Sequence, residues 1–125
     1  MGVLIDSSVL IDYERRKLDL ASYIAGREEE DFFICTVNAS ELLQGVWRAA
    51  DKAVRARRSA FVETIIRRFP VLPVSLRDAR VHARLCANLQ QKGLSIGVND
   101  SWIAAICILR NLGKRHLISP LTTDN

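Results

Sequence analysis

The sequence predicts a single α/β domain over residues 1–125, a three-layer α/β/α sandwich around a short, mainly parallel sheet. Short apolar runs that are typical of buried strands recur along the chain, and longer segments with apolar residues at helical spacing separate them. The run at 32–36 is apolar, as expected of a central strand that is covered on both faces. Strands and helices that alternate in this way favour a parallel sheet with helices on both sides. The expected strands are residues 3–5, 32–36, 71–74 and 117–118.

Helices are expected between and after these strands. Ser7 or Ser8 can cap the first helix, and Ser75 can cap the helix that follows the third strand. The segment 51–69 forms one amphipathic helix or one half of a helical pair. The segment 101–111 is apolar on nearly every side, so we expect it to be buried. The expected helices cover residues 9–17, 20–27, 38–50, 51–69, 76–92 and 101–111.

The composition is that of an ordinary globular domain of 125 residues, with 49% hydrophobic and 26% charged residues. Aromatic residues are few, which argues against an RNA-binding sheet covered with stacking rings. The net charge of +4 and the pI of about 9.3 favour a polyanionic partner. Cys35, Cys86 and Cys107 are widely spaced within apolar segments, so we expect buried thiols. The absence of a signal peptide and of a long apolar run predicts a cytoplasmic protein without a membrane anchor.

Four acidic residues stand out by their places in this map. Asp6 directly follows the first strand, and Glu41 lies in the first turn of the helix after the second. Asp100 starts the apolar helix, and Asp124 follows the last strand. The carboxyl ends of parallel strands meet at one edge of a sheet, so we expect all four acids to project from that edge. Like charges gathered there repel each other by about 4 kcal/mol per pair at ~4 Å and an effective dielectric near ~20. Since no Cys or His pair has ligand spacing, an all-oxygen pocket for Mg²⁺ or Mn²⁺ fits best.

Each of these acids also has a structural interpretation. Glu41 stands three residues after Asn38, as the partner in a capping box does. Asp100 can simply cap its helix. This interpretation is weakest for Asp6, because a carboxylate beside a buried strand is costly unless it is bound or hydrogen-bonded.

Positive charge is concentrated between Arg48 and Arg68, a segment with seven basic and two acidic residues. Such a helix can contact RNA phosphates, which positions RNA without reading its sequence. It can equally be a solvated face or contact a protein partner. The candidates for binding RNA or a partner are Arg48, Lys52, Arg55 and Arg58.

The four acids lie in four short blocks, which are IDSSV at 5–9, VNASEL at 37–42, NDSWIAA at 99–105 and LTTD at 121–124. In order and spacing these blocks resemble the signature blocks of PIN-domain ribonucleases. With the chain length, they are similar to the VapC-type toxins of bacterial and archaeal toxin–antitoxin pairs. Two features depart from the family pattern. The step from Gly113 to Asp124 is longer than usual and contains Pro120, and the chain stops at Asn125, where such toxins normally continue.

The resemblance implies a Mg²⁺- or Mn²⁺-dependent endoribonuclease with an α/β/α fold that cuts single-stranded or looped RNA and so inhibits translation. It implies that Asp6, Glu41 and Asp100 are metal-binding catalytic acids, with Asp124 at the fourth catalytic place. It also implies a homodimer and a VapB-like antitoxin whose C-terminal segment lies in the groove beside the site. The polar residues expected to support the acids are Ser8, Thr36, Asn99 and Thr123.

Two other interpretations stay open. A PIN-like module could hold RNA or a protein without cutting, although Asp6, Glu41 and Asp100 together argue for an enzyme. A phosphotransfer domain of the receiver or haloacid-dehalogenase type also places an aspartate after its first strand. The second of these expects another aspartate where Ser8 stands, and a receiver expects an early acidic pair and a late lysine. Neither pattern is present.

Overall fold

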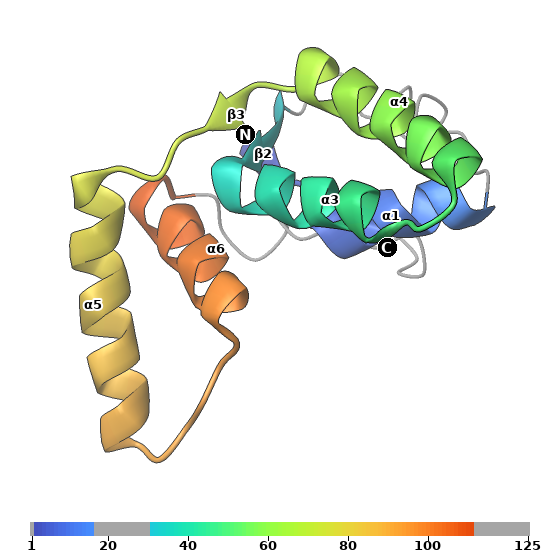
Figure 1. The fold of residues 1–125 in the computed structure, drawn as a ribbon. Coiled ribbons are helices and arrows are strands. Elements are labelled where there is room, and N and C mark those ends of the chain that lie inside the picture. Colours follow the sequence, from blue (N-terminus) through green and yellow to red (C-terminus); the bar gives the residue numbers. More distant parts are fainter. Residues whose placement is uncertain (1, 17–30, 112–125) are drawn as a thin grey trace.

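The computed structural model describes residues 2–16 and 31–111, and the strands and helices alternate there in the predicted order (Figure 1). The expected helix at 20–27, the expected strand at 117–118, and Thr123 and Asp124 lie outside the described residues. The elements are β1 (Gly2–Leu4), α1 (Ser7–Arg16), β2 (Asp31–Cys35), α3 (Thr36–Arg48), α4 (Lys52–Arg68), β3 (Val71–Leu72), α5 (Leu76–Gln91) and α6 (Val98–Leu109).

The three described strands form a parallel sheet in the order β1–β2–β3, which confirms the predicted short parallel sheet. β1 pairs with β2 along its whole length, and the amide of Ile5 extends this ladder with a hydrogen bond of 2.9 Å to the carbonyl oxygen of Phe33. β3 is only two residues long. It ends before Pro73, because proline has no amide hydrogen to donate to a ladder.

Helices bury both faces of this sheet, because side chains alternate between the two faces along each strand. Val3 and Ile34 belong to a core that also contains buried residues of α1, α3 and α4. Leu4 and Cys35, one residue further along each strand, belong to a second core that includes Ile106 of α6. The fold is therefore the predicted three-layer sandwich, and the sheet ends lie where helices from both layers begin.

The arginine-rich segment is half of a helical pair with α3, one of the two arrangements that its sequence allows. Asp51 caps α4, because its carboxylate accepts hydrogen bonds of 2.7 and 3.1 Å from two amides of the first turn. Two arginines of α4 reach back to the C-terminal end of α3. Arg55 donates two hydrogen bonds to the carbonyl oxygen of Ala49, at 2.7 and 3.1 Å, and Arg58 donates one of 3.2 Å to that of Gly45. Cations at this end of a helix offset its dipole.

α5 and α6 form a helical hairpin that leans away from α3 and α4 (Figure 1). Ser75 caps α5 as predicted, and the cap is a reciprocal capping box. The amide of Asp78 donates to the Ser75 hydroxyl at 3.3 Å, and the Asp78 carboxylate accepts from the Ser75 amide at 2.8 Å. Gly93 follows α5 with φ of +69°, a conformation that glycine adopts without strain.

A buried ion pair joins the start of α5 to the end of α6. Asp78 is fully buried, and Arg110 donates to its two carboxylate oxygens at 2.5 and 3.3 Å. Burial raises the pKa of Asp78, but hydrogen bonds from Arg110 and Ser75 outweigh this effect and hold the pKa below its ordinary value. Asp78 therefore stays ionised in the folded protein.

Two expectations about burial need correction. α6 is not buried on nearly every side, since Ile108 is 58% exposed. The helix packs against α5 and the sheet, and within the described residues its remaining side has no covering neighbour. Of the three cysteines only Cys35 is buried, whereas Cys86 and Cys107 are half-buried. Burial nevertheless raises the pKa of Cys107 to about 11, so this thiol is protonated at neutral pH.

No helix within the described residues is both long and apolar enough to cross a membrane.

We predict that Asp78→Asn lowers the free energy of unfolding by roughly 2 kcal/mol at pH 7, because it removes a hydrogen-bonded charge partner of Arg110. The folded-state pKa of Asp78 is depressed, so its contribution is present above pH ~4 and is lost as the pH falls through the folded pKa. Urea unfolding at pH 7 and pH 3 measures both effects. The exposed Glu63→Gln of α4 is the control. An equal loss in both variants at pH 7 would contradict the prediction.

Candidate active site

Three of the predicted acids line one open cleft of about 490 Å³ at the carboxyl ends of β1 and β2. Asp6 follows β1, Glu41 lies on α3 and Asp100 lies on α6, so three separate segments of the chain supply them. Asp124, the fourth predicted acid, lies outside the described residues. The residues that line the cleft are Asp6, Ser7, Ser8, Ile11, Glu41, Gln44, Arg48, Asn99 and Asp100.

Glu41 is the residue through which the three segments meet. The Ser7 hydroxyl donates to its Oε1 at 2.5 Å, and the Asn99 side-chain amide donates to its Oε2 at 3.1 Å. The expected capping box between Asn38 and Glu41 is wrong. α3 begins two residues earlier than expected, so Asn38 itself is the third residue and its side chain pairs with Cys35 at the helix start. The Glu41 carboxylate is therefore left for the cleft.

Asp6 stands at the junction of β1 and α1. Its carbonyl oxygen accepts from the amide of Val9 at 3.0 Å in the first turn of α1. The Ser8 hydroxyl donates to the Asp6 carboxylate at 2.8 Å. The expected capping of α1 by Ser7 or Ser8 is wrong, because the helix already begins at Ser7. Ser7 is instead buried, and it points to Glu41.

Asp100 is exposed in the first turn of α6 and does not cap it. The helix begins at Val98, three residues earlier than expected, and Gly97 holds the cap place without any side chain to cap it. The Asp100 Oδ2 lies 3.6 Å from where a Cβ on residue 97 would be. The structural interpretation of Asp100 as a cap therefore fails, and its carboxylate faces the cleft.

The chemistry of this donor set fits a hard divalent cation, because carboxylate oxygens are what Mg²⁺ and Mn²⁺ prefer. The side chains are not gathered as a complete set of ligands. Within residues 2–16 and 31–111, no group of three or more Asp, Glu, His or Cys side chains is arranged to hold a metal ion. Glu41 instead bonds Ser7 and Asn99, so the carboxylates must turn toward one another to share a cation.

The four basic candidates lie in different surroundings. Arg48 lines the cleft, and its guanidinium donates to the Gln44 side chain at 3.1 Å. Lys52 is exposed at the start of α4. Arg55 and Arg58 donate to carbonyl groups at the end of α3. Of the four, only Arg48 lines the cleft with all three acids, whereas Arg58 shares a neighbouring pocket with Glu41.

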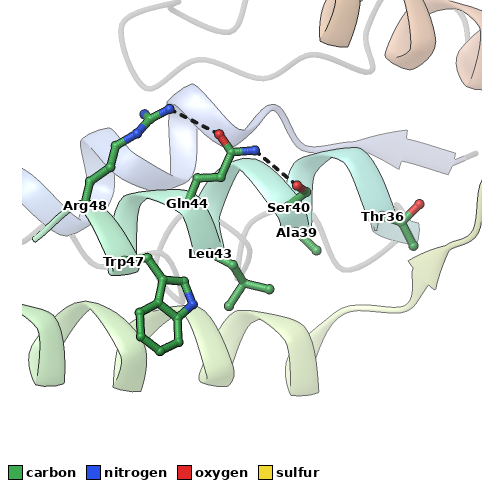
Figure 2. Close-up of a pocket in the computed structure, with 7 residues that line it drawn as sticks. All are labelled: Thr36, Ala39, Ser40, Leu43, Gln44, Trp47 and Arg48. Atoms are coloured by element: carbon green, nitrogen blue, oxygen red, sulfur yellow. Dashed lines mark hydrogen bonds between the residues drawn. The ribbon is translucent and has the colours of Figure 1, made fainter.

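Thr36 lies on a different surface from the one predicted. It is exposed, and it lines a shallow, mainly apolar groove of about 550 Å³ along the outer side of α3 (Figure 2). Trp47, 73% exposed, lies in this groove with the Arg55 guanidinium 5.6 Å from its ring centre. Gln44 and Arg48 line both the groove and the cleft, so the two hollows adjoin each other.

Sequence reasoning missed three residues of the cleft, the apolar Ile11 and the polar Ser7 and Gln44. Gln44 could have been found, because it stands three residues after Glu41 and therefore shares its side of the helix. Ser7 carried no such signal. Its inward direction depends on where α1 begins, and the sequence allowed Ser7 to be either a cap or a helical residue.

The chain is similar to a known protein family and to several proteins named Ribonuclease VapC. A family model described as PIN domain matches residues 3–118. Ribonuclease VapC of Rickettsia bellii is 32% identical over 111 residues, which cover 89% of this chain and 81% of that protein. Ribonuclease VapC4 of Mycobacterium tuberculosis is 32% identical over 122 residues, which cover 98% of this chain and 85% of that protein.

Solved structures of similar fold include toxin–antitoxin complexes. VapBC-5 from Mycobacterium tuberculosis, a member of the VapBC family of toxin–antitoxin systems, matches with a TM-score of 0.68 at 31% identity and covers 87% of this chain and 79% of that chain. VapBC2 from Rickettsia felis, bound to a DNA fragment from its promoter, matches with a TM-score of 0.76 over 89% of this chain and 83% of that chain. At 21% identity, the second match shows the shared fold.

We predict that Ser7→Ala lowers the free energy of unfolding by about 1 kcal/mol in metal-free buffer, because it removes a buried donor to the Glu41 carboxylate. Ser8→Ala is the matched control, since its exposed hydroxyl bonds Asp6 at the surface and should contribute less than half as much. Chemical denaturation in EDTA measures both. If Ser8→Ala costs as much as Ser7→Ala, the bond to Glu41 does not stabilise the fold as described.

Proposed function

Because this chain belongs to the PIN-domain family, we propose that it is an endoribonuclease that acts as the toxin of a toxin–antitoxin pair. The observation that carries the proposal is the meeting of Asp6, Glu41 and Asp100 in one open cleft beside Arg48. The relatives named Ribonuclease VapC support the activity, and the VapBC complexes support a protein antitoxin as the partner. RNA is the proposed substrate, and a homodimer is the proposed assembly.

The proposed cofactor is Mg²⁺ or Mn²⁺, which Asp6, Glu41 and Asp100 would hold. When bound, such a cation supplies positive charge to the scissile phosphate and lowers the pKa of a water for attack. Asp124 is proposed as the fourth acid and Thr123 as a polar neighbour of it, both on the basis of the family pattern alone.

The residues around the acids have distinct proposed tasks. Ser8 holds the Asp6 carboxylate, and Ser7 and Asn99 hold the two oxygens of Glu41. These donors carry no charge of their own, so they do not compete with a cation for the charge of the carboxylates. Arg48 supplies a guanidinium at the rim of the cleft, where its planar donors suit an RNA phosphate.

The alternative functions are less well supported. The match to a PIN domain over residues 3–118 argues against a receiver or haloacid-dehalogenase-like phosphotransfer domain. A non-cleaving module would have no need of three carboxylates from three segments in one cleft. A nuclease assay separates this module from the enzyme.

We predict that Asp6→Asn abolishes cleavage of total RNA, because the neutral amide binds a divalent cation poorly. Its melting temperature in metal-free buffer should stay equal to that of the wild type or rise, since one negative charge leaves the cleft. EDTA should stop the wild type in the same way, and added Mn²⁺ should restore it. Gel analysis of RNA with calorimetry of both proteins measures these effects. Cleavage by the wild type in EDTA would contradict the proposed metal dependence.

We predict that Arg48→Ala weakens RNA cleavage through a higher KM and reduces the dependence of log(kcat/KM) on log salt by about 0.7, the loss of one phosphate contact on a single strand. Arg67→Ala is the matched control. It removes an equal charge from an exposed place on α4 that does not line the cleft. The measurement is kcat/KM on a short RNA over a range of NaCl concentrations. Equal effects of the two variants would mean that only total charge matters.

A further inference from the structure

His82 of α5 contacts α6 directly beside the acid Asp100. Its Nε2 lies 2.9 Å from the Ser101 hydroxyl and 3.4 Å from the sulfur of Cys86. Its ring stacks on Trp102, with 3.7 Å between the ring centres and an angle of 3° between the planes. Through its contacts with Ser101 and Trp102, this histidine holds the two residues that follow Asp100.

The direction of the hydrogen bond from His82 follows from the proton count at Ser101. The Ser101 hydroxyl has one proton, which it donates to the carbonyl oxygen of Val98 at 2.6 Å. Its oxygen is therefore an acceptor toward His82, and the His82 Nε2 carries the hydrogen. This chain of bonds runs from α5 through Ser101 to the first residue of α6.

The start of α6 has few other anchors. Gly97 gives it no side-chain cap, and every residue from 91 to 100 is exposed. Ser101, 3% exposed, is the first buried residue of the helix. His82 holds this turn through its bond to Ser101 and its stack on Trp102, and the Asn99 side chain adds a hydrogen bond to Glu41.

We infer that His82 is a positioning residue, which fixes the first turn of α6 through its hydrogen bond to Ser101 and so holds Asp100 and Asn99 at the cleft. The inference rests on the proposed function for the role of Asp100, but the contact itself does not depend on it. His82 does not line the cleft. It acts through the backbone of α6, because Ser101 bonds the carbonyl of Val98 within the same turn.

Two substitutions separate the hydrogen bond from the stacked ring. His82→Phe keeps an aromatic ring for Trp102 and removes the donor. His82→Gln removes the ring and keeps a donor, because the glutamine amide nitrogen is as many bonds from Cα as the histidine Nε2. Cys86→Ala is the matched control, since Cys86 contacts the same His82 nitrogen from α5 and does not contact α6 side chains in the described contacts.

Two measurements report on the first turn of α6. Native-state hydrogen exchange follows the Ser101 amide, which donates to the Gly97 carbonyl at 2.9 Å, against the amide of Ile106 in the same helix. Calorimetric titration with Mn²⁺ alone gives the dissociation constant of the cation. In His82→Phe we expect Ser101 exchange to be about fivefold faster and Mn²⁺ binding about fivefold weaker, the loss of one hydrogen bond. Ile106 exchange should be unchanged.

His82→Gln and Cys86→Ala should stay near the wild type in both measurements. Wild-type behaviour of His82→Phe would overturn the inference. A loss of equal size in His82→Phe and His82→Gln, accompanied by faster exchange of Ile106, would also overturn it, because packing and not the bond would then be responsible. If the wild type binds no Mn²⁺, the proposed metal site fails, while the exchange rates still decide the positioning role.

Discussion

The parallel pairing of β1 with β2 is the constraint on which the rest of the structure depends. It makes both strands end at the same edge, so Asp6 and the start of α3 lie together there. Along each strand, alternate side chains lie on opposite faces of the sheet. One face packs with α1, α3 and α4 in the first core, and the other packs with α6 in the second core. The second core brings α6, and with it Asp100, to that edge. The pairing of β1 with β2 therefore determines both the sandwich fold and the position of the cleft.

The cleft is built as a shared network, with Glu41 in its centre. Ser7 from α1 and Asn99 from α6 each hold one of its oxygens, so one carboxylate ties three elements together. Neutral donors suit this task, because a cationic partner would cancel the charge that a metal needs. Within residues 2–16 and 31–111, a buried charge pair lies away from the cleft, between Asp78 and Arg110 at the opposite end of α6. There the paired charges stabilise the α5–α6 hairpin. The desolvation cost of burying them falls outside the cleft that holds the acids.

The sequence was sufficient for the order of elements, the parallel sheet and the acids, because alternation of apolar residues and the ends of strands are local signals. Helix caps were harder to predict. A shift of two or three residues in the start of α3 or α6 decides whether Asn38 or Glu41 belongs to the cap, and whether Asp100 caps or faces the cleft. The partners of Arg55 and the contact of His82 with Ser101 depend on how helices pack, and no local pattern encodes that.

The acids emerge from the ribosome in the order in which they stand in the sequence. A ribosome releases the N-terminal part first, so β1, β2 and α3 emerge with Asp6 and Glu41 well before α5 and α6 are complete. The α5–α6 hairpin supplies Asn99 and Asp100 later than β1 and α3 supply Asp6 and Glu41. A nascent chain therefore carries only part of its cleft until α6 has emerged and docked.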